Sequence, residues 1–213
     1  MEEGLTVRAA GQRIGVHKDT AWRWRHRLLA GLRARERELL QERVDLGQAL
    51  FPHSEKGART LGRSPYPRRQ LDPDRPNVRV LFARDAHART LAAILSPTPL
   101  SRPTEGELRA HLLPRLAPLC VLRSVWGGYQ PIAGLCRPRS PQARGLIGAR
   151  QLSFAHRGRS RVIPAYRVEL RRWLRRFHGI SSRYLANYLH WFRLIDPSEA
   201  ESDARRVLRV LCA

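Results

Sequence analysis

Two stretches of regularly spaced large apolar residues near the C-terminal end constrain the fold most. These residues recur at intervals of three and four: Tyr166, Leu170, Trp173, Leu174 and Phe177 in the first stretch, and Tyr184, Tyr188, Trp191, Phe192 and Ile195 in the second. That period places each set on one side of an α-helix. Gly179, followed by Ser181 or Ser182, is typical of one helix ending and the next beginning. Residues 164–195 are therefore predicted to form a helical hairpin that packs its aromatic stripes onto a core.

The middle of the chain has patterns typical of strands and short helices. The predicted strands are residues 78–84, 90–95, 119–125 and 147–154, and the predicted helices are 105–116 and 129–135. The first two strands would be joined by the turn at 85–88, and strands followed by alternating strands and helices are typical of an α/β layer. The stretch 53–77, rich in Pro, Gly, Ser and Arg, predicts a flexible loop.

The N-terminal segment has the pattern of a helix-turn-helix. A helix from Leu5 to Ile14, a turn at Gly15-Val16 and a second helix from about Asp19 to Leu32 are predicted. The expected buried face of the second helix is Ala21, Trp24, Leu28 and Leu32, and its other face carries Lys18, Arg23 and Arg27, with Thr20 and His26 beside them. Such a helix docks in the major groove of DNA, where these basic residues would contact bases or phosphates.

The charge balance also indicates a nucleic-acid partner. The 213 residues include 40 Lys and Arg against 18 Asp and Glu, a net charge of +22. Such a surplus favours a polyanion, and phosphate contacts release counterions. Between Arg139 and Arg183 there are twelve arginines and one acid, Glu169. We therefore expect a second DNA-backbone surface there, formed by Arg171, Arg172 and Arg175.

Cysteine and histidine positions do not indicate a metal site. Cys120, Cys136 and Cys212 are spaced neither as a disulfide framework nor as paired zinc knuckles, so they are expected to be reduced. The eight histidines show no ligand spacing. Because there is no apolar leader and no stretch long enough to cross a bilayer, we expect a cytoplasmic protein with no membrane partner.

Three stretches together resemble the insertion-sequence transposases of the ISXO-like group. They are LTVRAAGQRIGVHKDTAWRWRHRLLAGL, VRVLFARDAHARTLAAIL and, most specifically, AYRVELRRWLRRFHGISSRYLANYLHWFRLID. The resemblance implies a ribonuclease-H-like mixed sheet with flanking helices, preceded by an all-α module. The expected organisation is a helix-turn-helix at 1–38, a core at 39–198 and a tail at 199–213. It further implies a bacterial, nucleoid-associated protein that binds the double-stranded ends of its element, as a homo-oligomer in the simplest case. Such transposases carry a zinc ribbon before the helix-turn-helix, so this chain resembles an N-terminally truncated copy.

The positions that carry catalysis in this family differ here. The resemblance implies two Asp and a third acidic or amide residue that hold two Mg²⁺ ions for strand cleavage and transfer. Those positions correspond to Gly47, Ser124 (Val125 with a one-residue shift) and Pro164. Gly and Pro offer no side-chain ligand, and a neutral Ser hydroxyl is a poor one. Asp45, two residues from Gly47 and on the same strand face, is the candidate replacement. Glu169 is five residues from Pro164, a separation that places it about 140° round the helix.

Three hypotheses follow. The leading one is a DNA-binding protein of an insertion sequence whose nuclease site is degenerate, with no cofactor expected. The second is an active transposase that uses Asp45 and Mg²⁺. The third is a domesticated helix-turn-helix transcriptional regulator.

Overall fold

The computed structural model describes residues 5–35, 38–54, 77–95, 102–126, 130–136, 153–154 and 160–198. Most of the loop expected at 53–77, part of the strand expected at 147–154 and the tail at 199–213 lie outside the described residues.

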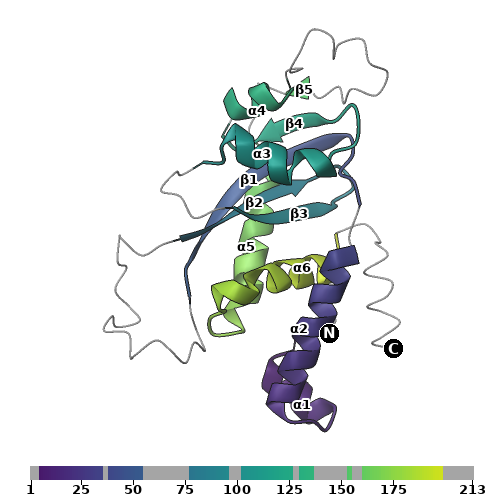
Figure 1. Cartoon of the computed structure of the whole chain (residues 1–213), viewed down its shortest axis with the longest axis vertical. Coiled ribbons are helices and arrows are strands. Elements are labelled where there is room, and N and C mark those ends of the chain that lie inside the picture. The colour runs from purple at the N-terminus through teal and green to yellow at the C-terminus, as the bar shows by residue number, and fades with distance from the viewer. Residues whose placement is uncertain are drawn as a thin grey trace.

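A five-stranded mixed sheet forms the centre of the body, in the order β3-β2-β1-β4-β5 (Figure 1). Strand β1 (Arg43–Pro52) pairs antiparallel with β2 (Asn77–Arg84) and parallel with β4 (Val121–Ser124). On the outer sides, β3 (Thr90–Leu95) pairs antiparallel with β2, and β5 (Ser153–Phe154) pairs parallel with β4. The expected α/β class, a mixed sheet with flanking helices behind a helix-turn-helix, is confirmed.

Helices cover both faces of this sheet because alternate residues of the central strands point to opposite sides. Val44, Leu46 and Leu81 belong to a core cluster with α3 (Glu105–His111) and α4 (Gln130–Cys136). Ala49 and Phe82 belong to a second cluster with α5 (Val162–Arg175) and α6 (Leu185–Ile195). The short 3₁₀ helix η1 (Leu113–Arg115) takes the place of the second half of the helix expected at 105–116, where Pro114 stands.

Both predicted C-terminal helices are present, joined by a short link, and their aromatic stripes belong to the core as expected. In Figure 1, α6 runs across the lower end of α5 and is not antiparallel to it as in the expected hairpin. Trp173 of α5 meets Trp191 of α6 edge to face at 5.1 Å, and Phe177 meets Tyr188 at 4.9 Å. Gly179 has a φ of +96° in the link, a conformation that glycine adopts without strain. Before α6, a 3₁₀ turn, η3 (Ser182–Tyr184), follows Ser181, which makes no side-chain cap.

Helix α6 lies between the rest of the body and the N-terminal module. Its residues from Asn187 to Leu194 are all buried, and a helix buried on every side must have neighbours all round. One neighbour is α2 (Lys18–Arg35), whose Leu29 joins the cluster of Trp191 and whose Leu32 packs with Leu194. The helix-turn-helix is therefore docked on the body along α6 (Figure 1).

The turn between α1 (Val7–Arg13) and α2 depends on two glycines. Thr6 caps α1, accepting a hydrogen bond from the Ala9 N–H at 3.3 Å. Gly15 has a φ of +68° in the turn, as expected for Gly15-Val16. A Cβ added to Gly11 would lie 2.8 Å from the Val16 carbonyl oxygen, so the two helices approach closely only because residue 11 has no side chain.

Gly11→Ala is therefore expected to destabilise the protein by about 1–3 kcal/mol, because the added methyl group forces the backbone apart. Thermal unfolding followed by circular dichroism measures this. The matched control is Gly31→Ala on α2, where an added Cβ meets nothing within 4 Å. That variant should be more stable than the wild type by roughly 0.5–1 kcal/mol, because alanine loses less backbone freedom in a helix. Equal effects of the two substitutions would contradict the close approach at Gly11.

Candidate nucleic-acid interface

Helix α2 presents a basic face on the side away from α6. Arg23 and Arg27 are exposed there, and their spacing of four residues places them on one side of the helix. Thr20 on this face is half-buried, and Lys18 is exposed in the first turn. Figure 1 shows α1 and α2 projecting below the sheet, away from most of the body.

Two of the residues predicted on α2 lie on the other side from the one expected. Trp24 was expected to be buried, but it is 55% exposed among the arginines. His26 was expected beside the basic residues, but it is buried. The reason is that α1 and α6 select the stripe Ala21, Arg25, Leu29 and Leu32, which is rotated from the expected stripe. Periodicity shows that a helix has a buried face, and the position of its neighbours decides which one.

The docked side of α2 is polar as well as apolar. The Arg25 guanidinium lies 4.6 Å from the centre of the Trp191 ring and donates to the Thr6 carbonyl at 3.3 Å. Burial lowers the pKa of Arg25. The Asn187 amide and the His26 Nδ1 are hydrogen-bonded at 3.1 Å. Burial, with a smaller contribution from the charge of Arg25, lowers the pKa of His26 to about 4, so this imidazole is neutral at pH 7.

The second predicted surface lies on the outer side of α5. Arg171, Arg172 and Arg175 are all exposed, and the opposite side of the helix is in the core. Arg172 forms an exposed ion pair with Glu169 at 3.2 Å. Glu169, the one acid between Arg139 and Arg183, therefore lies on the same exposed side of α5 as these arginines. Sequence reasoning placed these arginines correctly on a solvent-exposed face; that they contact DNA stays a prediction.

Of the three positions expected from the transposase resemblance to hold metal ligands, Gly47 and Ser124 lie on the neighbouring strands β1 and β4, and Gly47 faces an apolar junction. A Cβ added to Gly47 would lie 2.5 Å from Cγ2 of Ile163 and 3.3 Å from Cγ1 of Val125. Ser124 is buried and its Oγ accepts a hydrogen bond from the Trp126 N–H at 3.1 Å. Pro164, expected just before the helix, lies inside the first turn of α5 and is exposed. These residues do not fit a Mg²⁺ ion, because the first position has no room for a carboxylate.

The candidate replacement, Asp45, is already paired. Its carboxylate is buried, and Arg123 of the neighbouring strand β4 binds both oxygens, with the second contact at 3.0 Å. This hydrogen bonding raises the pKa of Arg123. In the described part of the chain, no three His, Cys, Asp or Glu residues lie together as a metal site would require.

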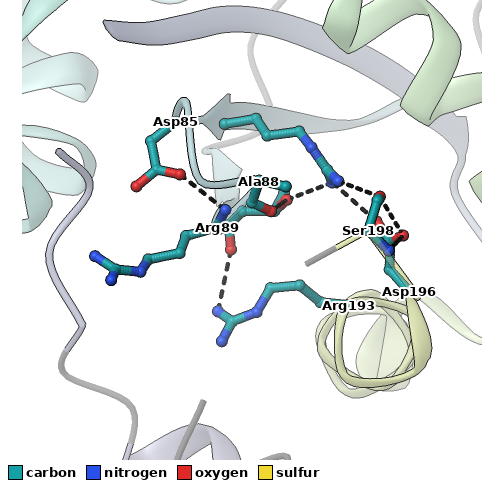
Figure 2. Close-up of polar contacts among 8 residues, drawn as sticks. Asp85, Ala88, Arg89, Arg193, Asp196 and Ser198 are labelled. Carbon is teal, nitrogen blue, oxygen red and sulfur yellow. Dashed lines mark hydrogen bonds and ion pairs between the residues drawn. The ribbon is translucent and has the colours of Figure 1, made fainter. Parts of the chain in front are cut away.

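A second arginine–carboxylate group stands at the same end of the sheet. Arg84, opposite Asp45 in the register of β1 and β2, donates to Asp196 at 2.9 Å and to Ser198 at 2.7 Å. Arg193 donates to the Thr90 carbonyl at 3.0 Å, and Figure 2 shows these contacts joining the end of α6 to the β2–β3 hairpin. The polar residues here hold helices to strands. Their long-range partners, like that of Asp45, could not be predicted from sequence spacing.

Comparison with known proteins identifies the N-terminal module. Residues 1–34 match the family model of the homeodomain-like domain. No curated protein and no solved structure matches the chain. No described helix combines the length and apolar character needed to cross a membrane. The chain therefore has a homeodomain-like helix-turn-helix DNA-binding domain at its N-terminus, followed by a mixed α/β body.

Proposed function

We propose that this protein binds duplex DNA as a member of the insertion-sequence transposases, recognising the ends of its element through α2. The observation that carries the proposal is the exposed arginine face of α2 in a homeodomain-like domain. Helices of this type enter the major groove with their N-terminal residues at base edges. Lys18, Thr20, Arg23 and Arg27 are the residues proposed to contact DNA there. Arg171, Arg172 and Arg175 on α5 are proposed to contact the backbone.

The affinity of the protein for duplex DNA is expected to fall steeply with salt, because each neutralised phosphate contributes about −0.9 to the slope of log K against log salt. Fluorescence anisotropy at several salt concentrations measures the slope, using duplexes selected from a random library. A slope near zero would rule out DNA binding by this surface. Selected sequences that match inverted repeats would indicate transposon ends, whereas an isolated operator would favour a domesticated regulator.

Arg27→Ala is expected to weaken binding to the selected duplex by roughly 5- to 100-fold, the range for one lost base-edge contact. Arg43 at the start of β1 is also exposed and provides a control that loses the same charge. The variant Arg43→Gln should keep wild-type affinity. Equal affinities of the two variants would show that Arg27 does not contact the DNA.

We further propose that the nuclease site is degenerate. Support comes from the apolar contacts that fill the Gly47 position and from the ion pair that occupies Asp45. A nicking assay on duplexes that carry the selected site, with Mg²⁺ or Mn²⁺, is expected to give no cleavage above background. Cleavage that Asp45→Ala abolishes would instead establish the active transposase.

A further inference from the structure

Helix α2 has a basic neighbour on each of its two flanks. On one flank lies α1, which is tied to α2 through Arg25 and Thr6 and carries the exposed residues Arg8 and Arg13. On the other flank lies the turn η3 before α6. There, the Tyr184 ring packs edge to face on Trp22 at 4.9 Å and lies 4.4 Å from the His26 ring.

Arg183 stands in this second flank. It is exposed, and its guanidinium lies 5.6 Å from the centre of the Tyr184 ring. A cation over a ring loses part of its side-chain freedom, and the planar N–H donors of arginine suit phosphate oxygens in a bidentate geometry. Because Tyr184 contacts Trp22, Arg183 is placed beside the first turns of α2 and not at its far end.

The dimensions of DNA indicate which group Arg183 would face when α2 lies in the major groove. A helix with its side chains is about 10–12 Å wide, and the major groove is about 12 Å wide. The phosphates of the two strands therefore run along both flanks of an inserted helix. In helix-turn-helix proteins the first helix crosses one strand, and α1 with Arg8 and Arg13 is placed for that role.

We propose that Arg183 binds a phosphate on the other wall of the groove, so that the DNA site is shared between the helix-turn-helix and the body. The inference rests on the proposed function, because it needs α2 in the major groove. Docking along α6 fixes the position of Arg183 relative to α2, because the His26–Asn187 contact and the burial of Leu29 keep η3 beside α2. A freely tethered helix-turn-helix would give Arg183 no fixed place on the duplex.

The test compares the salt dependence of DNA binding for three variants of the full chain. Arg183→Gln should make the slope of log K against log salt less steep by about 0.9, a loss of roughly eightfold in affinity at 0.1 M salt relative to 1 M. The loss should be equal for selected and unrelated duplexes, because phosphates carry no sequence. Arg183→Lys should retain most of the slope, and Arg43→Gln, which removes an equal charge elsewhere, should match the wild type.

Phosphate ethylation interference locates the contact. In the wild type, ethylated phosphates on both strands flanking the site of α2 should block binding. With Arg183→Gln, interference should disappear on one strand only, while the positions that depend on Arg13 remain. If Arg183→Gln keeps the wild-type slope and interference pattern, the inference is wrong and the proposed function stands. If DNA binding by the wild type itself shows no salt dependence, the proposed function is wrong, and the inference about Arg183 is wrong with it.

Discussion

Replacing Gly47 with aspartate is expected to destabilise the protein strongly instead of creating a metal site. The new Cβ would overlap Cγ2 of Ile163, and the carboxylate would be enclosed by Ile163 and Val125. Overpacking and burial of an unpaired charge together cost roughly 3 kcal/mol or more. For a chain of this size that loss lowers Tm by roughly 6–12 °C, which a thermal unfolding scan measures.

Gly31→Asp is the matched control for this substitution. An added Cβ at Gly31 meets nothing within 4 Å, so the same change there should alter stability by less than about 1 kcal/mol. Adding Mg²⁺ should not raise the Tm of Gly47→Asp, because a ligand stabilises only a state that binds it. A Tm that rises with Mg²⁺ concentration would show that the junction can open into a metal site after all.

The elements that could be predicted from the sequence are those with a local signal. Helices α5 and α6 were predicted because apolar residues repeat along each of them, and β2 and β3 were predicted because a short turn joins them. Strand β1 has neighbours from distant parts of the chain, including β4, and no local signal gives that register. The Asp45–Arg123 pair spans 78 residues for the same reason, so Asp45 could be placed on the correct strand face but not with its partner.

The basic residues of the candidate site were predicted correctly, but the side of α2 that is buried was predicted less well. Lys18, Arg23 and Arg27 are exposed as expected, since charged side chains stay in water unless they are paired. Trp24 and His26 exchange the environments expected of them, because α6 comes from the opposite end of the chain to cover one side of α2. Arg183 belongs to the basic stretch noted in the sequence, but its place beside α2 could not be predicted, because only that docking brings it there.

Acidification is expected to destabilise the contact between α2 and α6 before it affects the rest of the fold. His190 on α6 is buried, and its pKa is lowered to about 4 by burial and by the nearby charges of Arg33 and Arg115. His26 has a pKa lowered to about 4 as well, with Arg25, Tyr184 and Tyr188 as its ionisable neighbours. Thus two imidazoles are held neutral at one helix contact.

The direction of the change in stability with pH follows from how many protons the folded and the unfolded chain bind. In the unfolded chain both histidines bind protons below about pH 6.5, whereas in the folded protein they do so only near pH 4. Between these values the unfolded state binds more protons, so stability is complete above pH 6.5 and falls as the pH is lowered. From pH 6.5 to 4.5 the loss should be roughly 2 kcal/mol for each histidine. The lowered pKa of Asp196 acts in the same direction at still lower pH.

Urea unfolding between pH 4.5 and 7.5 measures how stability depends on pH. Substitutions at two neighbouring residues, His26 and Trp22, distinguish the effect of protonating His26 from the effect of altered packing. His26→Gln should remove about half of the slope between pH 6.5 and 4.5, because one of the two titrating groups is gone. Trp22→Phe alters the same contact with Tyr184 without removing a titratable group, so it should lower stability equally at every pH and keep the slope. A slope that His26→Gln leaves unchanged would mean that His26 is already protonated, or solvated, in the folded protein. The docking of the helix-turn-helix would then not depend on a neutral imidazole, and the Asn187 contact would be only a packing feature of the interface.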